Sequence, residues 1–412
     1  MKKFFCDFRI VDCDSDFLGS VFVENNRITE IFPSTLDIKC RQKAAVGADA
    51  VFSGGSRLVL MPGFIDMHAH FRTPGFQEKE TLESACLSAV RGGWTSSVCM
   101  ANTNPPVDNI SLANWIKKRA DEIMFINLYP VLSLTKGMKG KTLSDIKYLK
   151  KGEKYPPLFS EDGNDIKDAA VFLEALNAAA KLQTPVSCHC DRGGERKAVG
   201  RVINLGVKSM CHIHIAHVST DAAVSLIRNA KKTYRKHNGF RLTCEVTPHH
   251  IALNNTDALR LGISTYGKVA PALGSESDRR ALIEALRDGT IDIIATDHAP
   301  HTNEDKEKGA NGFTGFETAF PVLYTNLIRK NKFSLSSLSQ FLSASPAKIL
   351  GLKNKGRIRK NYCADIAVVD IDKKVVIKNE FFSRGKNSPF IGRNYYGEVA
   401  MTISGGRLVY ER

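Results

Sequence analysis

The stretch GFIDMHAHFRTPG, residues 63–75, runs from a short apolar segment into two histidines and an arginine. Alternate side chains of an extended strand share a face, so His68 and His70 point to one side and Ala69 to the other. Two imidazoles on one face can chelate a single metal ion. Because a chain with 11 histidines also contains such pairs by chance, the metal interpretation depends on what the other strands carry.

Seven further apolar stretches have the character of buried parallel strands. Most are separated by segments with helical periodicity, such as 142–151, 168–182 and 276–289. A strand and a helix that alternate eight times predict an α/β fold, a (β/α)8 barrel of TIM type. The connections at 191–210 and after the seventh strand are less regular, and 316–350 is expected to form closing helices. The seven stretches are TSSVCMAN (95–102), FINLYPVL (125–132), PPLFSED (156–162), PVSCHC (185–190), HIHIAHVS (212–219), LTCEVTP (242–248) and IDIIATD (291–297).

The two ends of the chain differ from this centre. Residues 19–33 and 364–377 alternate in the manner of β-strands, and neither flank alone makes a sheet with a full hydrophobic face. We therefore expect the flanks to combine into one small β-sandwich. The expected division is residues 1–60 for the first part of the sandwich, 61–350 for the barrel and 351–412 for the second part.

Composition excludes several classes of protein. The ten cysteines form no C-x-x-C pair, which argues against a disulfide framework and a zinc knuckle. The apolar runs are broken well before the roughly 20 residues of a membrane span, and the N-terminus lacks a signal-peptide pattern, so a cytoplasmic protein is expected. The net charge of +15 is spread along the chain without a nucleic-acid-binding motif, which favours a small anionic substrate over nucleic acid.

Six residues at the carboxyl ends of the expected strands are of types that bind metals. In a (β/α)8 barrel these ends face the active site, because the loops that follow the strands build that face. A carboxylate after an apolar run is costly to bury without a partner, and a metal ion supplies one. At the fourth strand Glu161 competes with its neighbour for the ligand role. The candidates are His68, His70, Asp162, His189, His217 and Asp297.

The sixth strand contains a second pair of alternating histidines, His212 and His214. If His217 points into the barrel, strand alternation turns residues at odd separations from it toward the surrounding helices. We therefore expect His212 and His214 to be structural and to face outward.

The residues around these positions resemble the dihydroorotases of the amidohydrolase superfamily, over nearly the whole chain. Eight motifs in the same order make the resemblance specific. It implies a zinc-dependent hydrolase of a cyclic amide that interconverts N-carbamoyl-L-aspartate and (S)-dihydroorotate in de novo pyrimidine biosynthesis. The matching stretches are PGFIDMHAHFRTPGFQEKE, MANTNPPVDN, FSEDG, HIAHVST, EVTPHH, ATDHAPH, GFTGFETAFPVLYT and SPAKILGL.

The resemblance also implies a role for each candidate. His68 and His70 would bind one Zn²⁺ with Asp297 beside it, and His189 and His217 a second, so one or two ions are expected per chain. Many superfamily members bridge the ions with a carboxylated lysine, whereas the bacterial dihydroorotases use an aspartate, which matches Asp162. Asp297 would also act as general acid and base. The substrate carboxylate would be held by Arg72, Asn102 and His301, which suits the planar guanidinium of an arginine.

Four features depart from the usual pattern of these enzymes. Thr73 stands where glutamate is common, and Ala270 and Gly274 replace asparagine and arginine near the expected substrate site. The connection between His189 and His217 is short, which removes a helical segment. The glycine-rich residues 306–315 are expected to form either a lid over the site or an ordinary surface loop.

Two alternatives remain beside this interpretation. A hydantoinase, dihydropyrimidinase or allantoinase would share the cyclic-amide chemistry, but those enzymes favour the carboxylated lysine and lack the carboxylate clamp. A non-catalytic dihydroorotase-like partner of aspartate carbamoyltransferase would have the same fold, although such scaffolds usually lose metal ligands. The sequence leaves open a homodimer and an association with aspartate carbamoyltransferase.

Overall fold

Eight short parallel strands form the centre of the computed structural model, which describes residues 1–33, 38–55, 57–150 and 156–412. One sheet contains β6 to β8 and a second contains β9 to β13. Single bridges join the two sheets, from Leu132 to Phe159 on one side and from Ala69 to His298 on the other. The strands therefore close into the predicted barrel. They are β6 (Phe64–Asp66), β7 (Trp94–Cys99), β8 (Asn127–Pro130), β9 (Phe159–Ser160), β10 (Val186–Cys188), β11 (His212–Ile215), β12 (Arg241–Val246) and β13 (Ile293–Ile294).

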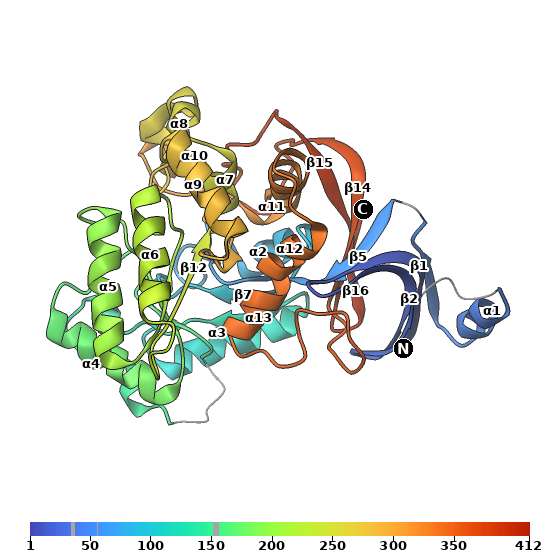
Figure 1. Ribbon diagram of the computed structural model, residues 1–412, viewed down its shortest axis with the longest axis horizontal. Coiled ribbons are helices and arrows are strands. Elements are labelled where there is room, and N and C mark those ends of the chain that lie inside the picture. The colour runs from blue at the N-terminus through green and yellow to red at the C-terminus, as the bar shows by residue number, and fades with distance from the viewer. Residues whose placement is uncertain (34–37, 56, 151–155) are drawn as a thin grey trace.

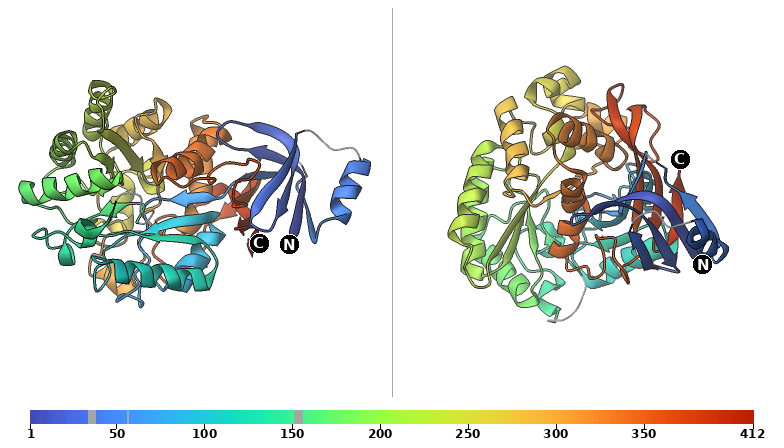
Figure 2. Two further views of the ribbon diagram at one scale, coloured as in Figure 1. Left: turned by 90° about the horizontal axis from the view of Figure 1, so that it is seen from below. Right: turned by 45° about the vertical axis from the view of Figure 1, so that its right-hand side comes forward.

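Helices surround the strands, as Figures 1 and 2 show. Their apolar faces pack on the barrel, and several begin at a capping side chain, such as Asp168, whose carboxylate accepts from the amides of Ala170 and Val171. The helices are α2 (Leu82–Arg91), α3 (Ile110–Ile123), α4 (Ala169–Leu182), α5 (Glu195–Ser209), α6 (Asp221–Thr233), α7 (Pro248–Ala252), α8 (Asn255–Leu261), α9 (Glu276–Arg287), α10 (Asn303–Glu307), α11 (Phe316–Leu323), α12 (Leu335–Ser339) and α13 (Ser345–Ile349).

Two connections differ from expectation. The segment 191–210 contains a regular helix, α5, because Val199, Val202 and Ile203 are spaced to form one buried face. The segment 142–150 forms only a short 3-10 turn, η2 (Asp145–Tyr148), so the helix predicted there is wrong over the described residues. No helix in the described part of the chain is both long and apolar enough to cross a membrane.

The two flanks combine, as predicted for the small β-sandwich, and their strands form one mixed sheet with the order β16-β15-β14-β5-β1-β2-β3 and β4 paired to β1. Antiparallel pairing of β5 with β14, in which Leu60 lies opposite Val368, joins the flanks. The sheet encloses its own apolar core, and α1 (Ile38–Val46) lies at its outer edge (Figure 1). The strands are β1 (Lys2–Val11), β2 (Asp16–Glu24), β3 (Arg27–Pro33), β4 (Ala50–Ser53), β5 (Leu58–Pro62), β14 (Ile366–Val376), β15 (Asn394–Ser404) and β16 (Arg407–Glu411).

The junction between sheet and barrel fixes the start of the candidate site. β5 pairs with β1 on one side and with β14 on the other, and it ends at Pro62. β6 begins at Phe64, so the first histidines follow closely after a strand that is hydrogen-bonded on both sides. The rings of Phe64 and Phe320 stack with centroids 5.8 Å apart, and Trp94 packs edge-on against Phe64. Full burial of such side chains contributes about 1.5–3 kcal/mol each, which anchors the strand from which His68 and His70 extend.

Candidate metal centre

All nine residues predicted for the site line one cavity of about 260 Å³ at the carboxyl ends of the barrel strands. The cavity is polar, and its volume is that of a small metabolite rather than of a polymer. The predicted residues are His68, His70, Arg72, Asn102, Asp162, His189, His217, Asp297 and His301, and the lining is completed by Gly163, Asp191, Arg192, Ala270, Ala299, Asn311 and Gly312.

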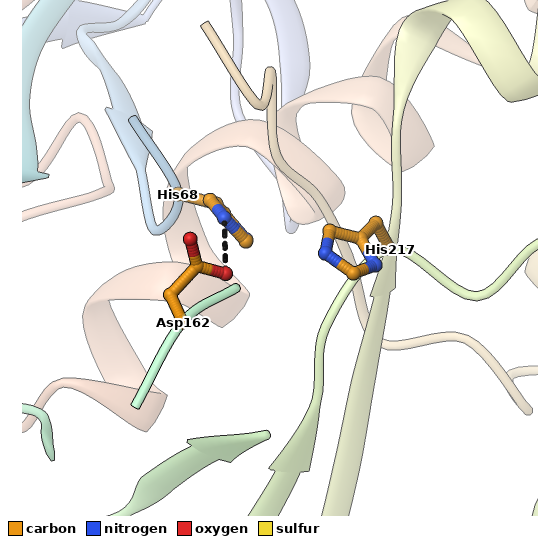
Figure 3. A group of neighbouring side chains, drawn as sticks. All are labelled: His68, Asp162 and His217. Carbon is orange, nitrogen blue, oxygen red and sulfur yellow. Dashed lines mark ion pairs between the residues drawn. The ribbon is translucent and has the colours of Figure 1, made fainter. Parts of the chain in front are cut away.

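His68, Asp162 and His217 form one compact group (Figure 3). The Nε2 atom of His68 lies 3.3 Å from Oδ1 of Asp162, and the rings of His68 and His217 have centroids 5.1 Å apart. One donor atom from each residue lies within 4.8 Å of the others, close enough to share an ion. His217 reaches the cavity through a backbone turn with φ of 32°.

A second group shares His68 with the first and adds His70 and Asp297. The Oδ1 atom of Asp297 lies 3.2 Å from Nε2 of His70 and 3.7 Å from Nε2 of His68. This is the arrangement implied for the first ion, in which both histidines of the opening motif meet the aspartate at the end of β13.

His189 lies on the other side of Asp162. Its Nδ1 atom is 3.5 Å from Oδ1 of Asp162, and its ring centroid is 4.6 Å from that of His217. Its Nε2 atom is 2.7 Å from the carboxylate of Asp191. Asp162 therefore stands between the imidazole of His68 and that of His189, where a bridging ligand would lie.

Three buried polar atoms that face one another in this cluster have no hydrogen-bond partner. They are Nε2 of His68, Oδ1 of Asp162 and Nδ1 of His189. Buried polar atoms are almost always paired, because an unpaired one costs about 1–3 kcal/mol. Nitrogen and carboxylate oxygen atoms in one buried cluster form the donor set of Zn²⁺ and similar ions, so the residues fit a metal site.

Hydrogen bonds orient the imidazoles of His68 and His70 toward the candidate metal site. The Nδ1 atom of His70 lies 2.9 Å from Oδ1 of Asn102, and Nδ1 of His68 lies 2.7 Å from Oε1 of Glu245. Because amide and carboxylate oxygens only accept, both Nδ1 atoms carry the proton. The Nε2 atoms of the two rings consequently face the cavity, where that of His68 lies near the carboxylate of Asp162 and that of His70 near the carboxylate of Asp297.

The charges of the site are strongly coupled. Burial alone would raise the pKa of Asp162, but the imidazoles of His68 and His189 lower it well below its ordinary value. Burial alone would lower the pKa of His189, but Asp162 and Asp191 raise it to about 10. Burial and the neighbouring His189 lower the pKa of His217 to about 3. The carboxylates are thus ionised, and binding of a cation would release the imidazole protons they now stabilise.

Arg72 and His301 lie together on the opposite wall of the cavity. The Nε atom of Arg72 donates to the carbonyl of Pro300 at 3.2 Å, and one terminal nitrogen lies 3.1 Å from Nε2 of His301. Within the described residues no carboxylate forms an ion pair with this guanidinium. A largely buried, unpaired arginine beside a cavity can receive an anionic group. Asn102, predicted with them, donates instead to Asp162 at 3.1 Å.

The glycine-rich segment 306–315 is anchored over the site. Lys306 is fully buried, and its ammonium donates to the carbonyls of Lys268, Ala310 and Gly312 at 2.8–3.1 Å. Gly312 has φ of 124°, and a Cβ there would lie 2.6 Å from that of Ala299. Asn311 and Gly312 both line the cavity, so this segment forms part of its wall.

One orientation predicted from the sequence is wrong. Ile213 and Ile215 pack toward the helices in the main apolar core, so their alternate neighbour His214 faces the barrel interior and lies 3.0 Å from the carboxylate of Glu245. The prediction failed because β11 ends at Ile215 and the positive φ of His217 breaks the alternation from which it was derived. Glu161, the rejected competitor of Asp162, accepts from the amides of Leu134 and Thr135, away from the cavity.

The three residues that depart from the usual pattern do not all lie at the cavity. Ala270 lines the cavity, whereas Gly274 and Thr73 do not. The hydroxyl of Thr73 donates to the carbonyl of Glu80, 3.4 Å away. Sequence reasoning missed Glu245 and Asp191, which contact the imidazoles of the candidate ligands His68 and His189. The position of Asp191 two residues after His189 and that of Glu245 within the apolar stretch 242–248 were usable signals, but the partner of Glu245 is 177 residues away and could not be named from the sequence.

Comparison with known proteins agrees with this geometry. Residues 59–409 match the Amidohydrolase family. The chain is 37% identical to a dihydroorotase of Clostridium botulinum, over 98% of each protein. It is 39% identical to a dihydroorotase of Bacillus caldolyticus, over 88% of this chain and 89% of that protein.

Solved structures agree on the fold. The L-hydantoinase (dihydropyrimidinase) of Arthrobacter aurescens superposes with a TM-score of 0.87 over 99% of this chain and 96% of that one, at 24% identity. The dihydropyrimidinase of Brevibacillus agri gives a TM-score of 0.84 at 21% identity, over 100% and 95%. The chain is a hydrolase of cyclic amides that belongs to the amidohydrolase family and, within it, to the dihydroorotases.

Proposed function

We propose that this protein is a zinc-dependent enzyme that interconverts N-carbamoyl-L-aspartate and (S)-dihydroorotate in the de novo synthesis of pyrimidines. The observation that carries the proposal is the cavity itself. A cluster of imidazoles and carboxylates occupies one wall, and an unpaired arginine occupies the other. A cyclic amide that bears a carboxylate matches both walls.

His68, His70 and Asp297 would hold one Zn²⁺, and His189 and His217 a second, with Asp162 between them. Support comes from the unpaired atoms of His68, Asp162 and His189, which converge in the cluster. When bound, zinc would supply an activated water nucleophile and polarise the ring carbonyl.

Asp297 would move the proton. Its carboxylate is ionised, because the imidazoles of His70, His68 and His217 lower its pKa despite the burial that would raise it. In hydrolysis it would accept a proton from the attacking water and deliver it to the ring nitrogen as the amide C–N bond breaks. In synthesis the same carboxylate would take the proton from the ureido nitrogen as the C–N bond forms and deliver it to the oxygen that leaves the carboxyl carbon as water.

Arg72 would bind the substrate carboxylate, with His301 and Asn102 beside it. The guanidinium is held by the carbonyl of Pro300, one of its terminal nitrogens contacts His301, and the residue lines the cavity. Hydantoin and dihydrouracil lack this carboxylate, so they would lose a charge-assisted contact worth about 1.5–3 kcal/mol.

An assay of the purified full chain tests the proposal. The protein is stripped with a chelator, reloaded with zinc and given dihydroorotate, N-carbamoyl-L-aspartate, hydantoin or dihydrouracil in turn. We expect turnover of the first two only, and only after zinc is added. Faster turnover of hydantoin would reassign the substrate, and no turnover above the stripped control would favour a non-catalytic partner of aspartate carbamoyltransferase.

A further inference from the structure

A continuous row of hydrogen-bonded side chains runs through the barrel beneath the metal cluster. The Nδ1 atom of His68 lies 2.7 Å from Oε1 of Glu245, and Oε2 of Glu245 lies 3.0 Å from Nε2 of His214. The Nδ1 atom of His214 is 2.9 Å from the hydroxyl of Thr243, which is 3.0 Å from Nε2 of His212. We call Glu245, His214, Thr243 and His212 the polar column.

The chemistry of the acceptor fixes the direction of the two bonds to Glu245, and the protonation of His214 sets the direction of the others. An ionised carboxylate only accepts, so His68 and His214 both donate to Glu245. When His214 is neutral, its other nitrogen accepts, and it receives the single proton of the Thr243 hydroxyl. The oxygen of Thr243 in turn accepts from His212. Every donor in the column therefore points toward Glu245, and each imidazole has one defined tautomer.

The column spans the barrel from one end to the other. His214 and Thr243 are paired residues of neighbouring strands, as are His212 and Arg241. His212 begins β11 and lines a second cavity, of about 480 Å³, together with Lys231 and Arg241. The row thus starts at a cavity where β11 and β12 begin and ends at a metal-ligand candidate where β6 ends.

Glu245 also contacts a second ligand candidate. Its Oε1 atom accepts from the backbone amide of His217 at 3.3 Å, where the chain has the positive φ that turns this imidazole into the cavity. One fully buried carboxylate thereby touches the ring of His68 and the backbone of His217. Movement of Glu245 would displace both residues.

We infer that Glu245, His214, Thr243 and His212 are positioning residues that hold His68 and His217 in the orientation needed to bind the metal. The inference rests on the metal site of the proposed function. With Nδ1 donating to Glu245, only Nε2 of His68 is free to bind an ion, and the carboxylate makes the ring a stronger ligand. His214 and Thr243 keep Glu245 in place, because a buried carboxylate needs donors on both oxygens.

Substitutions at Thr243 separate hydrogen bonding from packing. Thr243→Val keeps the shape but removes the hydroxyl from the middle of the column, whereas Thr243→Ser keeps the hydroxyl. The stripped proteins are titrated with zinc in competition with a chromophoric chelator, and the melting temperature of each metal-free form is recorded. We expect Thr243→Val to bind zinc about 10-fold more weakly and Glu245→Gln up to about 100-fold more weakly, with Thr243→Ser like the wild type.

A spectroscopic measurement reports on the column directly. Imidazole N–H protons held in buried hydrogen bonds exchange slowly and give separate proton NMR signals, which we expect in the wild type and Thr243→Ser but reduced in Thr243→Val. A change in packing alone would lower the melting temperature without removing these signals.

The outcomes separate the two proposals. If the wild type binds no zinc, the proposed function itself fails. If the wild type binds zinc and both Thr243→Val and Glu245→Gln bind it equally well, the positioning role is rejected. Equal weakening in Thr243→Val and Thr243→Ser also rejects it, because the hydroxyl would then be irrelevant. Should Glu245→Gln fail to fold, the two Thr243 variants still decide the question.

Discussion

The Oδ1 atom of Asp297 lies 3.2 Å from Nε2 of His70, although 227 positions separate the two residues in the chain. The contact exists because β6 and β13 are brought together as the barrel closes, where the amide of His70 donates to the carbonyl of His298 at 2.8 Å. Barrel closure thus joins the proposed proton carrier to the proposed metal ligands, and several consequences can be tested.

Asp297→Asn should retain zinc and lose most of the activity. The amide keeps an oxygen near His70 but cannot accept a proton, and general acid and base groups typically contribute about 10²–10⁴-fold to the rate. Metal content by atomic emission and kcat with dihydroorotate are the measurements. Asp121→Asn, which changes an exposed carboxylate on α3, is the matched control. Normal turnover in Asp297→Asn would reject the assigned role.

Arg72→Met should raise KM for dihydroorotate much more than it changes zinc content. Loss of a charge-assisted contact of about 1.5–3 kcal/mol corresponds to roughly 10- to 150-fold. The control is Arg196→Met, an exposed arginine of α5 outside the cavity. Steady-state kinetics and metal analysis are performed on the same preparations. Parallel loss of zinc and of substrate affinity would show that Arg72 stabilises the proposed metal site rather than binding the substrate.

Lys306→Met should loosen the segment 306–315. The substitution leaves the carbonyl of Ala310 without its donor and removes one of two donors from the carbonyls of Lys268 and Gly312, and an unpaired buried group costs about 1–3 kcal/mol. We expect a lower free energy of unfolding in urea, faster proteolysis near Gly309 and a higher KM. Lys308→Met, two residues away and exposed, should change none of these. If the two variants behave alike, the anchoring role of Lys306 is wrong.

His250 should make stability depend on pH. Its Nε2 atom donates to the carbonyl of Pro271 at 3.1 Å, its Nδ1 atom accepts from the hydroxyl of Thr247, and burial lowers its pKa from 6.5 to about 4. The unfolded chain binds the proton more readily, so this contribution is complete above pH 6.5 and is lost as the pH falls toward 4. The depression corresponds to a difference on the order of 3 kcal/mol.

Urea unfolding of wild type and His250→Gln between pH 4 and 7 measures this dependence. The glutamine variant should be less stable at pH 7 but should lose less stability on acidification. His237→Gln, at an exposed position, should follow the wild type. Identical slopes for wild type and His250→Gln would contradict the prediction.

Local patterns were sufficient to predict the barrel and several of the residues that meet in its cavity. Strand alternation placed His68 and His70 on one face. The rule that the carboxyl ends of parallel strands face the active site predicted that Asp162, His189 and Asp297 lie near them. These residues line one cavity because side-chain direction and strand ends follow from the local backbone, which nearby residues largely determine.

Other features depended on contacts across the barrel. The inward position of His214, its link to Glu245 and the burial of Lys306 arise from residues that meet only after folding. A histidine or lysine has the same local pattern whether solvent or a distant carboxylate lies opposite it. By itself the sequence determined which residues stand at the strand ends, and the tertiary structure alone decided which atoms face one another there, because hydrogen-bond partners are selected by packing rather than by proximity along the chain.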